Sequence, residues 1–162
     1  DILETAEFIK RASSFLKKRG YLSLSVSSFV PKPFTPFQWQ GMLARDELLK
    51  RRQRLHSELK SLKNIEVKFH DIASSILETV FSRADEKLSE VIFEAWKDGA
   101  KFDSWRESFN FSIWINAFKK LGIDLDKLAT KKIPYDETLP WDFIDIGIKK
   151  DDLIKEAIQC GL

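Results

Sequence analysis

Apolar and polar positions alternate with two different periods along the first seventy residues. Over residues 3–19 apolar side chains recur every three or four positions, which predicts an amphipathic helix ending near Gly20. Over residues 21–28 the period changes to two, which predicts a β-strand. A second helix is predicted over residues 43–62, and a second short strand over residues 65–70. The order helix–strand–helix–strand indicates a parallel sheet with covering helices.

The rest of the chain has a helical pattern, over residues 73–128 and again over residues 150–160. Within the first of these ranges, Gly99 and Gly122 are expected to end helices. We therefore expect two parts, βα units in residues 1–71 and a helical part in residues 72–162. A two-stranded sheet is marginal by itself and parallel strands need both faces covered, so the first part is expected to be the tail of a larger barrel or open sheet. Seven aromatic residues at helical spacing are expected to form a core in the second part: Trp96, Phe102, Trp105, Phe109, Phe111, Trp114 and Phe118.

The first strand has one apolar face and one serine face. The apolar face consists of Leu22, Leu24 and Val26, and the serine face consists of Ser23, Ser25 and Ser27. In a (βα) barrel the outward face packs on helices, and three inward serines would leave a roomy lumen that can form hydrogen bonds. A solvent-facing edge strand would have the same pattern, so the strand alone leaves both interpretations open.

A proline-rich loop follows this strand. Its prolines are Pro31, Pro33 and Pro36, and its aromatic residues are Phe34, Phe37 and Trp39. Proline restricts the backbone, so Lys32 and Thr35 are expected to be held in place as hydrogen-bond donors. Catalytic loops follow the C-terminal ends of barrel strands, which favours a rigid wall of a ligand pocket. The alternative is an ordinary rigid turn whose aromatic side chains plug the barrel mouth.

Three acidic residues and a histidine are weaker candidates for chemistry. His70 and Asp71 follow the second strand and could form an acid–base pair, although Asp71 is more plausible as the N-cap of the next helix. Asp142 and Asp145 could form a carboxylate pair. For Asp142 we favour a turn-capping role, and for Asp145 both interpretations stay open.

Composition excludes several function classes. The net charge of +2 over 162 residues gives no reason to expect nucleic acid or an anionic membrane, and no apolar run approaches the roughly 20 residues of a membrane span. One cysteine, Cys160, and two histidines cannot supply the three or four ligands of a structural zinc or an iron–sulfur cluster. An amphipathic pattern starts at Asp1, so we expect no signal peptide and a cytoplasmic chain. The sequence has no initiator methionine, so we expect it to begin inside a longer protein.

Clusters of basic residues indicate an alternative function, a helical module that binds RNA or a protein partner. Lys50–Arg54 and Lys131–Lys132 are candidate RNA contacts, although a solvated helix face is the expected role of Lys50–Arg54 at this net charge. Arg83–Lys87 is a candidate phosphate-binding cluster, for which the favoured alternative is a helix start with Asp85 as N-cap. A protein partner is a further alternative, and so is a structural role in which an exposed strand edge pairs two copies of the chain.

Several motifs occur in a fixed order along the chain. They are Val26–Pro33 (VSSFVPKP), Thr35–Trp39 (TPFQW), Glu94–Trp96 (EAW), Gly99–Ala100 (GA), Phe102–Trp105 (FDSW) and Leu139–Gly147 (LPWDFIDIG). Together they resemble the C-terminal third of radical SAM proteins that carry an N-terminal cobalamin-binding domain, which are Fe–S oxidoreductase-like proteins. The resemblance extends from about residue 22 to about residue 156.

The resemblance implies the α/β tail of a partial (βα) radical SAM barrel, with two short parallel strands, followed by an all-helical C-terminal cap. It also implies that one wall of the pocket for S-adenosylmethionine (SAM) includes Ser25, Ser27, Ser28, Phe29, Lys32 and Thr35. Members of this family bind a [4Fe–4S] cluster through a CxxxCxxC loop near the start of the barrel. Reductive cleavage of SAM at that cluster yields a 5′-deoxyadenosyl radical.

This chain departs from the family pattern at three points. It has no CxxxCxxC loop, Phe34 stands where histidine is common, and Ala84 and Glu86 stand where glycine and arginine are common. We therefore expect a catalytically inert part of a radical SAM enzyme, with no catalytic or metal-binding residue of its own. Its expected partner is the N-terminal remainder of its own polypeptide, which would carry the [4Fe–4S] cluster, SAM and, in its N-terminal domain, cobalamin.

Overall fold

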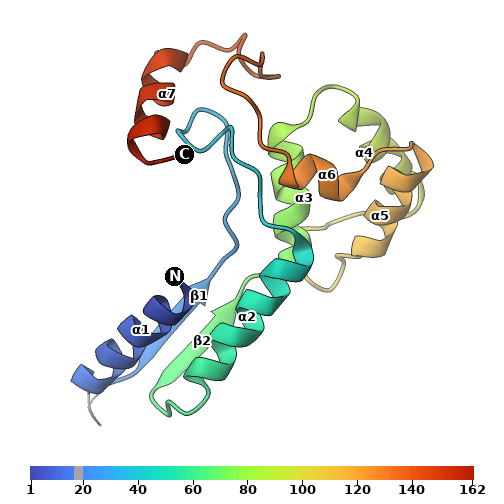
Figure 1. Cartoon of the computed structure of the whole chain (residues 1–162). Coiled ribbons are helices and arrows are strands. Elements are labelled where there is room, and N and C mark those ends of the chain that lie inside the picture. The colour runs from blue at the N-terminus through green and yellow to red at the C-terminus, as the bar shows by residue number, and fades with distance from the viewer. Residues whose placement is uncertain (17–19) are drawn as a thin grey trace. The chain divides into compact units, whose positions relative to one another are not determined.

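The computed structural model describes residues 1–16 and 20–162, and in them helices dominate, with two short parallel strands (Figure 1). The chain divides into two compact units. Unit 1 comprises Asp1–Phe29 and Ala44–Ile72, and unit 2 comprises Val30–Leu43 and Ala73–Leu162. The proline-rich loop therefore groups with the helical unit rather than with the strand that precedes it.

Unit 1 has the predicted order of two helices and two strands. The elements are α1 (Ile2–Leu16), β1 (Leu22–Val26), α2 (Arg45–Leu59) and β2 (Ile65–Phe69). The strands pair in parallel, with Leu22 opposite Ile65 and Val26 opposite Phe69. The last three residues of the first predicted helix, 17–19, lie outside the described residues.

Both strands are shorter than predicted because the ladder between them ends early. The amide of His70 donates to the carbonyl of Val26 at 2.9 Å, and β1 ends there, whereas its predicted strand continued to Ser28. The apolar face of the sheet packs on a small core from α1 and α2 that contains Ala6, Ile9, Leu55 and Leu59. The period-two pattern therefore buries one face of the sheet, as predicted for a half-covered strand pair.

Polar contacts also tie α1 to α2 and to the turn after it. The side chain of Asn64 donates to the carbonyl of Ser13 at 3.1 Å and accepts from the Ser13 hydroxyl at 2.6 Å. Lys10 on α1 pairs with Glu58 on α2 at 2.9 Å. The buried serine at the end of α1 is thus hydrogen-bonded to the residue that precedes β2.

Unit 2 contains the remaining helices. They are α3 (Ile72–Arg83, whose first residue belongs to unit 1), α4 (Leu88–Lys97), α5 (Phe111–Lys120), α6 (Leu125–Thr130) and α7 (Lys150–Gln159). The side chain of Asn110 caps α5 by accepting from the amide of Ser112, and Asp124 caps α6 in the same way through the amide of Lys127. Gly99 and Gly122 follow α4 and α5 at positive φ, so the predicted glycine stops are confirmed.

The proline-rich loop packs against the segment that follows α6. The amide of Met42 donates to the carbonyl of Ala129 and the amide of Ile133 donates to the carbonyl of Trp39, each at 2.8 Å. Between them Gly41 lies so close to the chain that an added Cβ would be 1.9 Å from the carbonyl oxygen of Thr130. A core cluster then joins the loop to α7 through Trp39, Ile133, Leu139, Trp141, Leu153 and Ala157.

The expected aromatic core in this unit is only partly correct. Trp114 and Phe118 are buried, but Trp96, Phe102 and Trp105 are 54%, 75% and 65% exposed. Helix α4 turns Val91 and Ala95 inward, four residues apart, and this leaves Trp96 on its outer side. Phe102 and Trp105 lie in the connection between α4 and α5, where helical spacing does not determine burial.

Candidate functional site

The serine face of the sheet in unit 1 is open. The side chains of Ser23, Ser25 and Ser27 are exposed, while the neighbouring residues on the other face of β1 are half-buried. On β2 the exposed side chains in the same register are Glu66 and Lys68, which form an ion pair at 3.3 Å. Unit 1 therefore presents a polar surface along one face of its two-stranded sheet.

His70 pairs with Ser25 on this surface. The Ser25 hydroxyl lies 3.2 Å from Nε2 of His70, which follows the end of β2. Ser25 lies on β1 and His70 follows β2, so the pairing of the two strands brings these side chains together. A serine hydroxyl and an imidazole nitrogen can each donate or accept a hydrogen bond, so this pair is a contact of the predicted wall through which a proton could pass.

The six residues of the predicted SAM wall are divided between the two units. Ser25, Ser27, Ser28 and Phe29 belong to unit 1, whereas Lys32 and Thr35 belong to unit 2. Within unit 1 the first two are exposed, Ser28 is half-buried, and Phe29 is 48% exposed. The strand end thus keeps polar groups accessible, as a ligand wall requires.

Lys32 and Thr35 are held in place, but by partners within unit 2. The ammonium of Lys32 pairs with Glu78 on α3 at 2.5 Å and lies 3.4 Å from the hydroxyl of Ser82. The Thr35 hydroxyl donates to the carbonyl of Lys32 at 2.8 Å. Lys32 therefore ties the loop to α3, and Thr35 stabilises the turn between the prolines.

Gln38 is the central polar residue of this loop, and the sequence analysis did not single it out. Its side chain is 3% exposed, and its Oε1 accepts from the amide of Phe34 at 3.0 Å and from Nε1 of Trp141 at 2.8 Å. Phe34 has a φ of 59°, which its hydrogen bond to Gln38 helps to hold. One amide oxygen thus joins the TPFQW motif to the LPWDFIDIG motif, 103 residues away.

Asp142 and Asp145 cap turns. Asp142 accepts from the amide of Leu139 at 2.9 Å and from the ammonium of Lys150 at 2.7 Å, which confirms the structural role favoured for it. Asp145 accepts from the amide of Gly147 at 2.7 Å. We find no contact between the two carboxylates, so they are not a catalytic pair in this arrangement.

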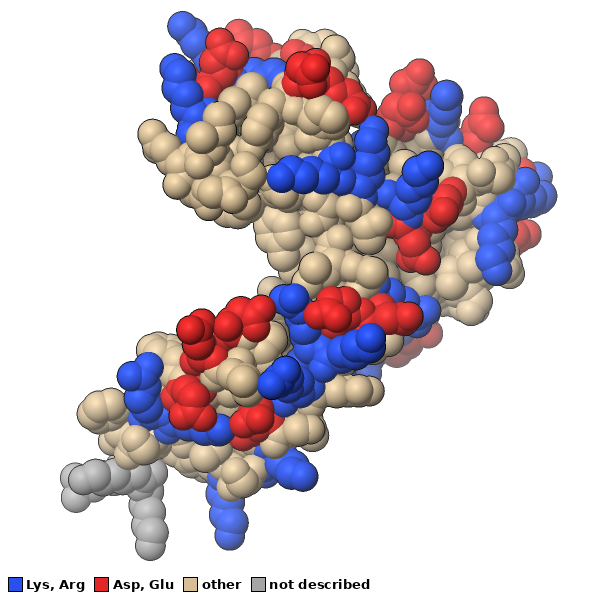
Figure 2. Space-filling view, in the orientation of Figure 1, with Lys and Arg blue, Asp and Glu red and all other residues tan. Residues whose placement is uncertain are grey.

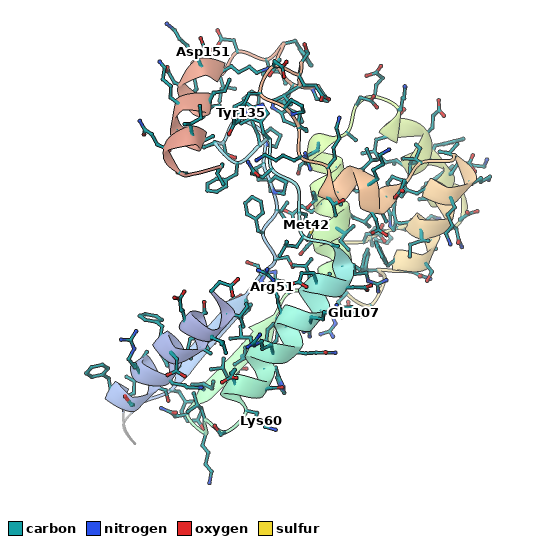
Figure 3. The ribbon with its side chains drawn as sticks, in the orientation of Figure 1. Met42, Arg51, Lys60, Glu107, Tyr135 and Asp151 are labelled. Carbon is teal, nitrogen blue, oxygen red and sulfur yellow. The ribbon has the colours of Figure 1, made fainter. Side chains whose placement is uncertain are left out.

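The two basic clusters belong to different units. Lys50–Arg54 lies on α2 in unit 1, where Arg51, labelled in Figure 3, pairs with Glu47 and Asp1. Lys131–Lys132 lies in unit 2, where Lys131 pairs with Glu137. Figure 2 shows Lys and Arg side chains interspersed with Asp and Glu on the visible face of the chain. These ion pairs are typical of a solvated helix surface.

The Arg83–Lys87 cluster differs from its predicted arrangement. Helix α4 begins at Leu88 with Lys87 as the N-cap residue, so the prediction of Asp85 as N-cap is wrong. The Asp85 side chain instead accepts from the amide of Lys87 at 3.0 Å, in the turn before the helix. Arg83, at the end of α3, is only 8% exposed and is the most buried charged residue that the structure describes.

Comparison with known protein families, with curated proteins and with solved structures finds no match for this chain. In the described ranges, no three His, Cys, Asp or Glu side chains are grouped so that they could hold a metal ion. No helix in the same ranges combines the length and the apolar character needed to cross a bilayer.

Proposed function

We propose that this chain is the C-terminal part of a radical SAM Fe–S oxidoreductase-like protein and that it supplies part of the wall of the SAM and substrate pocket. The observation that carries the proposal is the open polar face of the β1–β2 sheet. Parallel sheets are normally covered on both faces, yet here α1 and α2 cover one face and the serine face is exposed. Further parallel strands beside β1 or β2 would close this face into a barrel lumen.

Exposed aromatic side chains on the helical side of unit 1 support the same proposal. Phe8 and Phe15 lie seven residues apart on one side of α1 and are 64% and 86% exposed. In a (βα) barrel the outer helices pack against one another, so an additional βα unit would cover these two rings. The contact between Gln38 and Trp141 also supports it, since it joins two of the motifs that carry the resemblance.

The residues present fit one part of the implied chemistry and not the other. Serine hydroxyls both donate and accept hydrogen bonds, and they suit the ribose and amino-acid groups of SAM. An iron–sulfur cluster does not fit this chain, because its single cysteine, Cys160, is an exposed residue that follows α7. We therefore derive no step through a cluster, and the proposed role of the chain is to bind and orient.

The test starts with the reading frame upstream of Asp1. We expect it to encode a CxxxCxxC loop, and we expect the full-length protein, reconstituted with iron and sulfide, to cleave SAM to 5′-deoxyadenosine. In that protein Ser25→Ala should weaken SAM binding by about three- to tenfold, the effect of one lost hydrogen bond. The matched change Ser57→Ala, at an exposed serine on α2, should leave SAM binding unchanged.

Two results would overturn the proposal. The first is an upstream frame without cluster cysteines. The second is a [4Fe–4S] spectrum with SAM cleavage from these 162 residues alone, because the chain would then bind a cluster itself and could not be the cluster-free part of the enzyme.

A further inference from the structure

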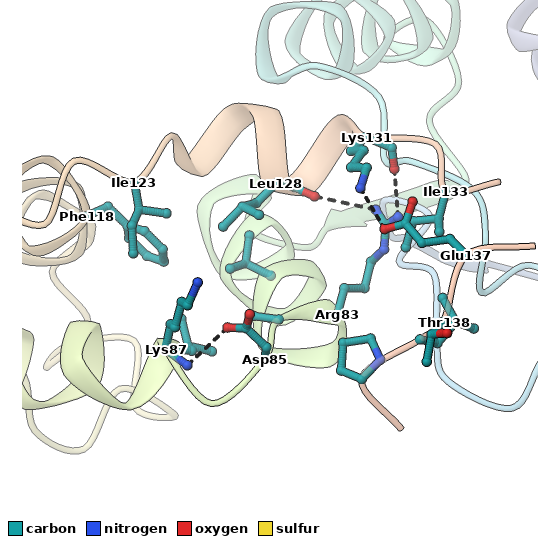
Figure 4. A pocket seen from close by; sticks show the side chains of 15 residues that line it. Arg83, Asp85, Lys87, Phe118, Ile123, Leu128, Lys131, Ile133, Glu137 and Thr138 are labelled. Carbon is teal, nitrogen blue, oxygen red and sulfur yellow. Dashed lines mark hydrogen bonds and ion pairs between the residues drawn. The ribbon is translucent and has the colours of Figure 1, made fainter. Parts of the chain in front are cut away.

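A pocket of about 380 Å³ lies within unit 2, between the turn that joins α3 to α4 and the segment around α6 (Figure 4). Small-molecule pockets fall in the range of about 300 to 1,000 Å³, so this one could hold a ligand of one or two rings. It lies wholly within unit 2 and includes none of the six residues of the predicted SAM wall. The inference below therefore does not depend on the proposed radical SAM function.

Arg83 lines this pocket as a buried cation without an acidic partner. Its Nη2 donates to the carbonyl of Lys131 at 2.6 Å, and its Nη1 donates to the carbonyls of Ala129 and Leu128 at 3.3 and 3.5 Å. Its Nε is buried and makes no hydrogen bond. Among the described residues no carboxylate lies within ion-pair distance of the guanidinium.

The carbonyl oxygens at the end of α6 compensate this charge only in part. They are dipoles at a helix C-terminus and stabilise a cation, but they carry less charge than a carboxylate. Burial accordingly lowers the pKa of Arg83 from its ordinary value. The guanidinium stays charged at neutral pH because the ordinary value is so high, so the pocket wall has a positive potential.

Lys87 adds a second cation with no ion pair in the described part of the chain. Figure 4 shows its side chain extending from the α3–α4 turn toward the side of the pocket formed by Phe118, Ile123 and Leu128. Its backbone amide, and not its ammonium, contacts Asp85. The ammonium is therefore available to a ligand.

The two carboxylates that line the pocket already have partners. Glu137 pairs with Lys131 at 2.9 Å, and Asp85 accepts from the amide of Lys87. Three cationic and two acidic side chains line the pocket, and the two cations without an acidic partner are Arg83 and Lys87. An anion is thus favoured over a cation or a zwitterion.

The rest of the lining is apolar. It includes Val80, Leu88, Phe118, Ile123, Leu128 and Leu139. Apolar walls favour a hydrocarbon body, and a few charged groups at one side fix its orientation. We propose that this pocket binds a small organic anion with an apolar body of one or two rings, whose anionic group pairs with Lys87 while the buried charge of Arg83 adds to the positive potential of the pocket.

The experiment uses two probes that share one body and differ in charge. 5-(Dimethylamino)naphthalene-1-sulfonate carries a sulfonate on a two-ring body, and 1-(dimethylamino)naphthalene is the same ring system without it. Fluorescence titration of the purified chain should show that the sulfonate binds and that Lys87→Gln weakens its binding about tenfold, the loss of one charge-assisted hydrogen bond. The neutral probe should bind both forms equally.

A matched variant and a second measurement locate the site. Lys101→Gln, at an exposed lysine of unit 2 outside the pocket, should leave the affinity for the sulfonate unchanged. Methyl NMR should show the largest shifts at Leu88, Ile123 and Leu128. The proposal fails if the sulfonate does not bind, if Lys101→Gln weakens its binding as much as Lys87→Gln, or if the largest methyl shift occurs at Ile92, an exposed residue of α4.

Discussion

Replacing Gln38 by leucine tests the polar contact that joins the loop to the segment before α7. Leucine has a similar volume but no acceptor, so the substitution leaves Nε1 of Trp141 and the amide of Phe34 without their partner. A buried donor left unsatisfied costs about 1–3 kcal/mol. Trp141 is 7% exposed and pays most of this cost, whereas Phe34 is half-buried and recovers part of it from water.

We therefore expect Gln38→Leu to lower the free energy of unfolding of unit 2 by about 2–4 kcal/mol. With a urea dependence of about 2 kcal/mol per molar, the midpoint of unfolding should fall by about 1–2 M. Tryptophan fluorescence is the appropriate signal because all five tryptophans of the chain lie in unit 2.

Gln40→Leu is the matched control, two residues away. Its side chain makes no hydrogen bond that we find, and its Nε2 is buried without a partner. Removing an unsatisfied polar group should leave stability unchanged or raise it slightly. Equal losses for Gln38→Leu and Gln40→Leu would refute the reasoning, because the cost would then not come from the two donors.

Two further substitutions test packing and charge in unit 2. Gly41→Ala places a Cβ 1.9 Å from the carbonyl oxygen of Thr130 and should lower the free energy of unfolding in urea by about 3 kcal/mol. Gly99 has open space around it but a φ of 101°, so Gly99→Ala should lower it by only about 1 kcal/mol. Equal losses for the two variants would contradict this reasoning. A hydrogen bond from Lys120, and a smaller effect of one from Lys97, lower the pKa of Glu94. The contribution of the Glu94 ion pairs to folding stability is therefore present above the ordinary glutamate pKa and is lost as pH falls through the folded-state pKa. Between about pH 6 and pH 3 the wild-type chain should lose more stability than Glu94→Gln, and parallel pH profiles of the two would show that the ion pairs do not contribute.

Sequence reasoning worked best where periodicity is local. The change from a helical period to a period of two predicted β1 beside α1, and the glycines after α4 and α5 predicted their ends. It worked less well in the connection between α4 and α5, where Phe102 and Trp105 were expected in the core and are exposed. Outside a regular element, spacing along the chain says little about which way a side chain points.

The candidate site was predictable only in outline. The serine face follows from alternation along β1, but the pairing of Ser25 with His70 depends on the register between two strands 40 or more residues apart. Arg83 had a recognisable signal, since it follows Ile76 and Val80 at helical spacing on α3 and therefore falls on a buried stripe. The lack of an acidic partner for it could not be inferred, because the groups that surround it come from α6.

By itself the sequence determined the helix–strand order of unit 1, the two faces of its strands and the ends of α4 and α5. These properties depend on side-chain spacing and backbone preference within a few residues. Only the tertiary structure decided that the proline-rich loop belongs with the helical unit, that Gln38 accepts from Trp141, and that a pocket opens beside Arg83. Each of these depends on contacts between residues far apart in the chain, whose geometry no local pattern specifies.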